Sequence, residues 1–311
     1  MDALPPKDPA RRTPSRPAQP GRPDWARDGK DWPNRAVSQF HRVAGIEWHV
    51  QIMGQGPVLL LLHGTGAATH SWRDLLPLLA QDFTVIAPDL PGHGFTSQPD
   101  RAGMSLPGMA RGVASLLDKL GLQPDYAAGH SAGAAILAEM CLAERIAPKA
   151  LVSLNGAMLP LPFHGVAAPL MGPIAKLFAS NPLVPMLFAW QAADGAVVRK
   201  LLHGTGSKID AEGERFYTRL ARRSGHAGAA LTMMAHWDLK TFAQRLGRLE
   251  TPLLLVVGGN DLSIPPSDAQ RIKLLLPRAE ITVLPGLGHL AHEERPAKTA
   301  DLLRGFFNER A

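Results

Sequence analysis

The sequence predicts an α/β fold, with a mostly parallel central sheet, helices on both faces and a helical cap insertion. Three observations predict it. Short, continuous apolar runs recur along the chain, as expected of strands buried on both faces. Helical patterns alternate with these runs, which is typical of parallel sheets covered by helices. Residues 158–250 interrupt the alternation with apolar, proline-punctuated stretches that contain no buried strand.

Each predicted element follows from its local pattern. Residues 48–53 alternate apolar and polar side chains, as an early antiparallel strand would, and Gly54 and Gly56 mark the turn after it. The other predicted strands are apolar runs at 58–62, 84–87, 125–128, 150–154, 253–257 and 281–284. The predicted helices are 71–79, 106–120, 132–142, 267–276 and 297–307.

The chain divides into three predicted parts. Residues 1–30 are basic and rich in proline, with too few apolar side chains to offset the entropy of ordering, so we expect a disordered tail. Order is expected to begin near Trp32. Residues 31–157 and 251–311 then form the core, and residues 158–250 form a helical cap, or lid, that shapes a substrate pocket.

Composition and charge narrow the possible classes of protein, partner and cellular compartment. The 311 residues carry a net charge of +6, but residues 1–35 hold eight Lys/Arg against five Asp/Glu, so half of the excess lies there. The body is nearly balanced, and no nucleic-acid partner is expected. The single cysteine, Cys141, permits no internal disulfide and fits a cytoplasmic location. We expect neither a transmembrane segment nor a secretory signal.

The strongest single signal is a G-x-S-x-G pentapeptide with Gly129, Ser131 and Gly133 at its fixed positions. It lies between a predicted strand and a predicted helix, the context of a nucleophile elbow. Such a turn lifts the serine hydroxyl out of the sheet and leaves no room for side chains at the two glycines. It also aims the backbone N–H of Ala132 at the position of a developing oxyanion.

An activated serine needs a base and an acid that orients it. Asp261 follows the strand predicted at 253–257 and is a candidate for the acid, although an aspartate after Gly-Asn is also common in turns. His289 follows the last predicted strand and is the candidate base. His292 is its rival, but we expect it inside the final helix, solvated or capping. The order Ser, Asp, His fits this class of site.

The second oxyanion donor is expected in the loop after the strand at 58–62. Gly64 and Gly66 allow the backbone there to approach a substrate, and the N–H of Thr65 is the candidate partner of the Ala132 N–H. We expect His63 to be structural rather than a second base.

The joint pattern resembles the alpha/beta-hydrolase superfamily over about residues 40–310, and the D-L-P-G-H-G turn at 89–94 also matches it. The nucleophile is serine, so the resemblance does not extend to haloalkane dehalogenases or epoxide hydrolases. A narrower resemblance is to the BchO family, magnesium-chelatase accessory proteins of bacteriochlorophyll biosynthesis. The stretches that carry it are 31–35, 63–72, 129–135, 233–239 and 286–296.

The narrower resemblance implies a role near the insertion of magnesium into protoporphyrin IX, with magnesium-chelatase subunits as partners. The sequence contains no G-x-x-x-x-G-K-[ST] loop and no Cys/His/Asp cluster with metal-ligand spacing. We therefore expect neither the ATPase nor the metal-inserting subunit but a companion protein, with no cofactor and no metal.

Two interpretations of the cap remain open. Its methionines and tryptophans could line an apolar pocket for an acyl or tetrapyrrole substrate, or they could be ordinary cap core. The residues concerned are Met158, Met171, Met186, Trp190, Met233, Met234 and Trp237. The expected function is a serine hydrolase of an ester or related acyl bond. The alternatives are a non-hydrolytic porphyrin-binding or chaperoning protein, and a general carboxylesterase or cofactor-free perhydrolase.

Overall fold

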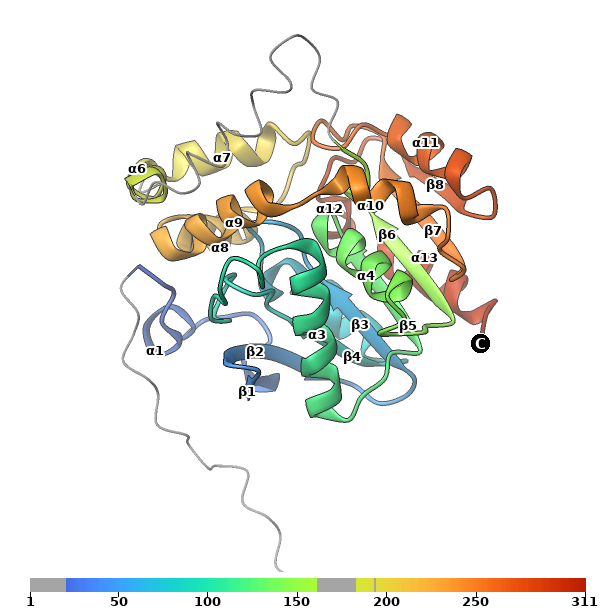
Figure 1. The fold of residues 1–311 in the computed structure, drawn as a ribbon. Coiled ribbons are helices and arrows are strands. Elements are labelled where there is room, and N and C mark those ends of the chain that lie inside the picture. Colours follow the sequence, from blue (N-terminus) through green and yellow to red (C-terminus); the bar gives the residue numbers. More distant parts are fainter. Residues whose placement is uncertain (1–20, 161–182, 193) are drawn as a thin grey trace, which may run out of the picture.

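The computed structural model describes residues 21–160, 183–192 and 194–311, which form an eight-stranded sheet flanked by helices (Figure 1). The strand order is β1-β2-β4-β3-β5-β6-β7-β8. β2 pairs antiparallel with both β1 and β4, and every other neighbouring pair is parallel. The predicted α/β class and mostly parallel sheet are therefore confirmed.

The strands are β1 (Ser38–Val43), β2 (Ile46–Met53), β3 (Val58–Leu62), β4 (Thr84–Pro88), β5 (Tyr126–His130), β6 (Ala150–Leu154), β7 (Leu253–Gly258) and β8 (Glu280–Leu284). The helices of the first half are α1 (Trp25–Asp28), α2 (Leu75–Leu79), α3 (Leu106–Leu120) and α4 (Ala132–Leu142), with 3-10 turns η1 (Arg35–Val37) and η2 (Thr69–Trp72). The later helices are α6 (Leu183–Gln191), α7 (Gly195–His203), α8 (Ala211–Ala221), α9 (Ser224–His236), α10 (Leu239–Leu246), α11 (Ser267–Leu275), α12 (Ala291–Glu294) and α13 (Pro296–Asn308).

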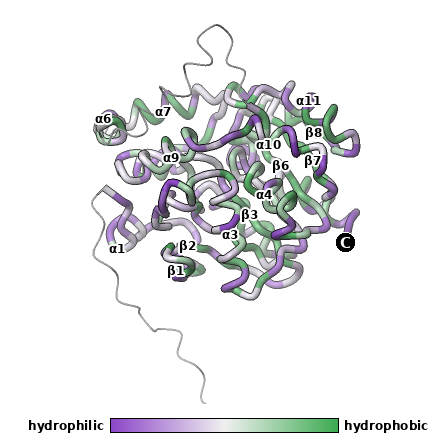
Figure 2. Tube along the Cα trace, viewed as in Figure 1, coloured by the Kyte–Doolittle hydropathy of each residue, from purple (hydrophilic) through white to green (hydrophobic). Residues whose placement is uncertain are grey.

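The apolar strands hold the two helical layers against the sheet. Successive side chains of a strand point to opposite faces, so Leu60 and Leu62 of β3 join one hydrophobic cluster, with α3 and α4. Leu59 and Leu61 join the other, with α2 and α13. In Figure 1, α3 and α4 lie in front of the sheet and α13 behind it, and Figure 2 shows hydrophobic colour along strands β6 and β7.

Two elements of the structure differ from the prediction. β1 was not predicted, because it is an edge strand whose side chains are exposed or half-buried, and its sequence shows no apolar alternation. The helix predicted at 71–79 is two pieces, since η2 ends at Trp72 and α2 begins at Leu75.

The tail prediction is wrong for its last ten residues, since α1 lies within them. Trp25 packs edge-on against Phe40 and Phe95, with ring centroids 5.3 Å and 4.8 Å apart. Asp24 caps α1 by accepting a hydrogen bond from the Arg27 backbone. The tryptophan, the cap and the ion pair of Asp28 with Arg223 thus help to order a segment whose composition alone suggested disorder. Residues 1–20 lie outside the described part of the chain.

Between β6 and β7 the described residues are helical. The helices α6 to α9 lie together at one end of the molecule (Figure 1), where α6 packs on α9 and α7 packs on α8. α10 packs on the core, because Phe242 and Leu246 are buried in the same cluster as α3 and α4, and Ala229 and Met233 of α9 also join this cluster. Of the predicted cap residues, Met171 lies outside the described residues.

We expect Trp25→Ala to detach the segment 21–30. The indole supplies much of the apolar contact of α1, and truncation of a large aromatic residue costs about 3 kcal/mol or more when it is buried, and less at a half-buried position such as this one. Limited trypsin digestion should then cut after Arg27 faster than in the wild type. Trp237→Ala, a half-buried tryptophan far away in sequence, is the control, and equal cleavage rates in both variants would contradict the prediction.

Candidate active site

Ser131 occupies a strained turn between β5 and α4. Its backbone has φ 52° and ψ −116°, a conformation that costs a non-glycine residue on the order of 1–3 kcal/mol. Neighbouring backbone stabilises the turn, since the Ser131 N–H donates to the Leu154 carbonyl and the Ser131 carbonyl accepts from the Ala157 N–H. Backbone strain of this kind, held by surrounding structure, is typical of functional positions.

The motif glycines are needed because backbone passes very close to them. A Cβ at Gly129 would lie 2.5 Å from the backbone nitrogen of Ala134, and one at Gly133 would lie 2.0 Å from the Leu62 carbonyl oxygen. The second contact seats α4 directly on the end of β3. Both glycines are therefore required by packing, as the elbow interpretation expects.

The loop after β3 lies beside the serine. A Cβ at Gly64 would lie 3.0 Å from the Ser131 Cβ and 2.8 Å from the His130 ring. Gly66 has φ 76°, which favours glycine. His63 is held at both ring nitrogens, because Nδ1–H donates to the Gly64 carbonyl at 2.8 Å and Nε2 accepts from the Leu90 N–H at 2.9 Å. These bonds hold His63 as part of the loop.

Asp261 and His289 form a buried pair. His289 Nδ1 and Asp261 Oδ2 are 2.8 Å apart, and the carboxylate is almost fully buried. The other oxygen, Oδ1, accepts from the backbone N–H groups of Ser263 and Ile264. Asp261 is thus a turn aspartate and a histidine partner at once, and the two sequence interpretations are not exclusive. The arrangement orients the imidazole and leaves Nε2 as its basic atom.

Asn155 supports this pair and was not anticipated. It directly follows β6, with φ 50°, and its Nδ2 donates to Asp261 Oδ2 at 2.8 Å and to the Gly288 carbonyl at 3.3 Å. The sequence signal was a polar residue at the carboxyl end of a buried strand, next to the strands that precede Ser131 and Asp261.

His130 brings the histidine loop to the serine. Its Nε2–H donates to the His289 carbonyl at 3.0 Å, and the two rings lie 4.7 Å apart. Because His130 precedes Ser131 in the chain, this bond places the backbone of His289 against the elbow. The structure therefore brings Ser131, His289, Asp261 and the Gly64 loop to one edge of the sheet.

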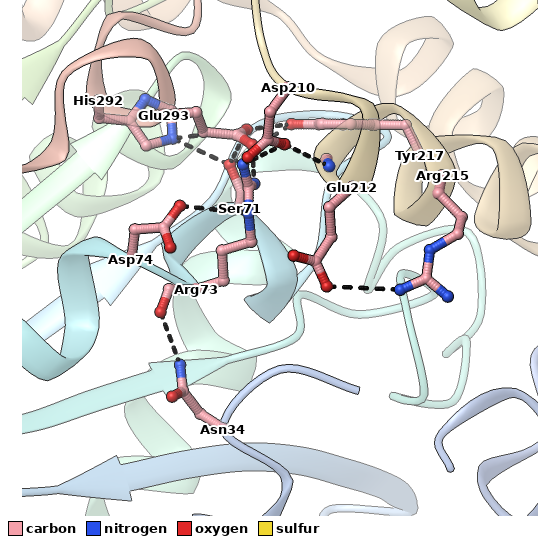
Figure 3. A network of polar contacts seen from close by, with 11 residues as sticks. Asn34, Ser71, Arg73, Asp74, Asp210, Glu212, Arg215, Tyr217, His292 and Glu293 are labelled. Carbon is pink, nitrogen blue, oxygen red and sulfur yellow. Dashed lines mark hydrogen bonds and ion pairs between the residues drawn. The ribbon is translucent and has the colours of Figure 1, made fainter. Parts of the chain in front are cut away.

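The expected setting of His292 is wrong. It lies in the short helix α12 rather than the final helix, and it is buried rather than solvated. Its Nε2 is 2.9 Å from the Ser71 hydroxyl (Figure 3). Its ring centroid lies 4.4 Å from that of His130, with the two rings tilted by 42°. Its partner is thus Ser71, which weakens its candidacy as the base.

Ser71 and Arg73 centre a polar network that joins core and cap (Figure 3). Ser71 and Tyr217 of α8 both donate to Glu293 Oε1, each at 2.6 Å. Arg73 binds Glu293 at 2.7 Å and Asp210, the N-cap of α8, at 2.9 Å. The network fixes the start of α8 over η2 and α12.

His226 makes a second connection from the cap and was not anticipated. It lies in α9, accepts from the Gly94 N–H at 3.0 Å and donates to the Gly66 carbonyl at 3.1 Å. Its neighbour on the same helix, Met233, is buried, and the Thr65 hydroxyl contacts its sulfur at 3.6 Å. α9 therefore covers the loop that holds the candidate oxyanion donor.

The predicted pocket residues divide into two groups. Met233 is buried against Thr65, and Trp237 is half-buried, with its Nε1–H donating to the Met104 carbonyl. Trp190 is 73% exposed and Met234 is 58% exposed, so these two do not enclose a pocket and are not cap core. Met158 is buried in the main core and Met186 is exposed.

Six histidines around the site are buried, and burial lowers the pKa of each because it disfavours the charged ring. They are His63, His70, His93, His130, His226 and His292. Burial lowers the pKa of His226 to about 4 and of His292 to about 3. At neutral pH these rings are therefore uncharged. Within the described residues, no group of three or more histidines, cysteines or carboxylates is arranged to hold a metal ion.

A family model described as the alpha/beta hydrolase fold matches residues 57–296. The magnesium-chelatase 30 kDa subunit of Rhodobacter capsulatus is 37% identical over 265 residues, which covers 85% of this chain and 92% of that protein. The 2-hydroxy-6-oxo-6-phenylhexa-2,4-dienoate hydrolase of Burkholderia cepacia is 26% identical over 262 residues, 79% of this chain and 86% of the relative. A solved serine hydrolase involved in carbazole degradation superimposes with a TM-score of 0.69, at 21% identity, over 88% of this chain and 99% of that one.

We expect the free energy of unfolding to fall steeply between pH 6.5 and pH 4. In the unfolded chain these histidines titrate near 6.5, so below that pH the unfolded state takes up protons that the folded state does not. Stability is therefore complete above pH 6.5, and each buried histidine contributes up to about 1.4 kcal/mol per pH unit until its folded pKa is reached. Burial raises the pKa of Glu293, so this one carboxyl group has the opposite effect and adds stability as the pH falls.

Urea unfolding at pH 7.5 and pH 5.5 measures this slope. His226→Gln should reduce it, whereas His203→Gln should not, because His203 is largely exposed. Equal stability of the wild type at both pH values would contradict the prediction.

Proposed function

The chain belongs to the alpha/beta hydrolase fold family, and we propose that it is a serine hydrolase that cleaves an ester or related acyl bond. The observation that carries the proposal is the convergence of three groups at the carboxyl edge of the sheet. Ser131 lies in a strained turn, the Asp261–His289 pair is buried, and His130 ties the two together. A protein that only binds a ligand has no chemical need for this combination.

In the proposed reaction, His289 Nε2 takes the proton of the Ser131 hydroxyl as its oxygen attacks the acyl carbon. The tetrahedral oxyanion accepts hydrogen bonds from the backbone N–H groups of Ala132 and Thr65. The carbon–oxygen bond to the leaving group then breaks, and His289 returns the proton to the departing alkoxide. Water, activated by the same imidazole, releases the acyl group and restores the serine.

The roles of the surrounding residues follow from their contacts. Asp261 stabilises the imidazolium that forms on His289, and Asn155 holds the carboxylate that faces it. His226 holds the Gly66 carbonyl and thereby the loop that carries Thr65. Removal of a single oxyanion donor typically costs about 100-fold to 1,000-fold in turnover, so the position of this loop matters.

We further propose that the substrate is apolar and that the reaction accompanies magnesium insertion into a porphyrin. Met233 lies beside Thr65 and supports an apolar acyl or tetrapyrrole substrate. The likeness to a magnesium-chelatase 30 kDa subunit, over most of both chains, supports an accessory role with chelatase subunits as partners. A carboxylesterase or perhydrolase activity would use the same residues on other substrates.

A fluorophosphonate probe tests the serine directly. It should label Ser131, as mapped by mass spectrometry of the modified peptide, because the Asp261–His289 pair activates that hydroxyl. His289→Ala should abolish labelling, and Ser131→Ala should lower turnover of an activated ester by at least about 1,000-fold. His292→Ala is the matched control, since its partner is Ser71, and it should retain labelling when folded. Labelling that survives in His289→Ala would refute the assignment.

Porphyrin binding tests the accessory role separately. Titration with protoporphyrin IX should quench tryptophan fluorescence saturably, in the wild type and in Ser131→Ala alike, because binding does not require the nucleophile. Saturable quenching without probe labelling would favour the non-hydrolytic binding protein. The absence of saturable quenching would count against a tetrapyrrole ligand, whatever the labelling result.

A further inference from the structure

We propose that the outer face of the cap docks on an anionic phospholipid bilayer, with helix α6 as the contact element. The central residues of this surface are Met186, Leu187 and Trp190, which we call the α6 face. They are 57%, 55% and 73% exposed. The proposal concerns binding alone and does not depend on the hydrolysis proposed above.

The α6 face is one continuous side of the helix. At about 100° per residue, positions 186, 187 and 190 fall within an arc of about 100°. Pro185 and Ala189 fall outside this arc and are buried. The helix therefore has a clear inward and outward side, yet its sequence, LVPMLFAWQ, contains no charged residue on either.

Helix α8 of the same cap shows the usual pattern of a surface helix. It buries Phe216 and Leu220 and presents charged residues such as Glu212 and Arg215 outward. A helix that is apolar on all sides is normally buried, so the α6 face lacks the polar cover that exposure to water requires. Contiguous exposed apolar surfaces commonly mark interaction sites.

The charge beside α6 favours an anionic partner. A cavity of about 610 Å³ begins at Gly195, four residues after the last residue of α6, and lies between α1, α7 and α8. Its lining holds the guanidinium groups of Arg199, Arg215, Arg219, Arg222 and Arg223 and the carboxylates of Asp28 and Glu214. Three of these arginines are paired, since Arg215 and Arg219 bind Asp31 and Arg223 binds Asp28. The exposed positive charge on the helix that follows α6 is therefore that of Arg199 and Lys200 on α7. The Arg222 Nε–H donates to the carbonyl of Ala192, which connects this cavity to the end of α6.

The two features together match the chemistry of a phospholipid surface. Guanidinium groups bind phosphate oxygens with matched geometry. Tryptophan favours the boundary between headgroups and acyl chains, and methionine and leucine side chains enter the acyl region. No helix of the described residues is long and apolar enough to cross a membrane. The mode proposed is attachment to one membrane surface.

Co-sedimentation with vesicles tests the proposal. The full chain should bind vesicles of phosphatidylcholine mixed with phosphatidylglycerol, and bind vesicles of phosphatidylcholine alone more weakly. The triple variant Met186→Ser/Leu187→Ser/Trp190→Ser should lose at least about tenfold in partition, because its apolar contact is gone. Leu274→Ser on α11 is the control, since Leu274 is 83% exposed on another part of the molecule, and it should bind as the wild type does.

The charge contribution has its own pair of variants. Arg199→Ala should weaken binding to the phosphatidylglycerol vesicles by about fivefold, the effect typical of one basic residue near an anionic surface. Arg248→Ala, an exposed arginine just after α10, should leave it unchanged. Ser131→Ala should bind vesicles fully, so a failure of the hydrolase proposal leaves this test intact.

Three results would overturn the proposal. In the first, the wild type fails to bind the phosphatidylglycerol vesicles. In the second, the triple variant binds as tightly as the wild type, which would assign binding to other basic parts of the chain. In the third, light scattering shows a dimer that only the triple variant dissociates, without vesicle binding, so that a second copy covers the α6 face. The altered side chains are exposed, so the variants should keep the wild-type melting temperature.

Discussion

The approach of α4 to the end of β3 determines the geometry of the site. Only a residue without a Cβ fits where Gly133 meets the Leu62 carbonyl, and this contact fixes the direction in which α4 leaves the sheet. The direction of the helix in turn fixes the turn before it, which holds Ser131 at a positive φ. The loop after β3 begins at the same point, so Gly64 comes to lie against the serine.

The surroundings of this contact are unusually polar for an interior. Uncharged histidines fill the space between the sheet edge and the cap, and most of their hydrogen bonds run to backbone groups of loops. Buried polar groups are costly when unpaired, so such bonds hold the loops in single arrangements. His226 and the Arg73 network each connect a cap helix to the loop after β3, from two directions.

Most of the sheet, and the placement of the three candidate triad residues after its strands, could be predicted from the sequence, for one physical reason. Strands buried on both faces are continuous apolar runs, and the residues that follow parallel strands meet at one edge. Ser131 and Asp261 follow such strands, and His289 follows the partly buried edge strand β8. β1 and α1 could not be predicted, because an edge strand and a four-residue helix lack an apolar pattern. Asn155 and His226 act through contacts between distant segments, which a single sequence does not reveal. Trp190 was misplaced because composition does not distinguish the inner side of a cap helix from the outer.

The network of Ser71, Arg73 and Glu293 bears on how this cap could be exchanged. Tyr217 and Asp210 belong to the cap, while the groups that they satisfy belong to the core. A foreign lid grafted between β6 and β7 would leave the buried Glu293 and Arg73 short of partners, a loss on the order of 1–3 kcal/mol for each unsatisfied group. Substrate preference in this scaffold is therefore easier to alter by point substitutions on α9 than by transplanting a whole lid. A transplanted lid would have to keep the equivalents of Asp210, Tyr217 and His226.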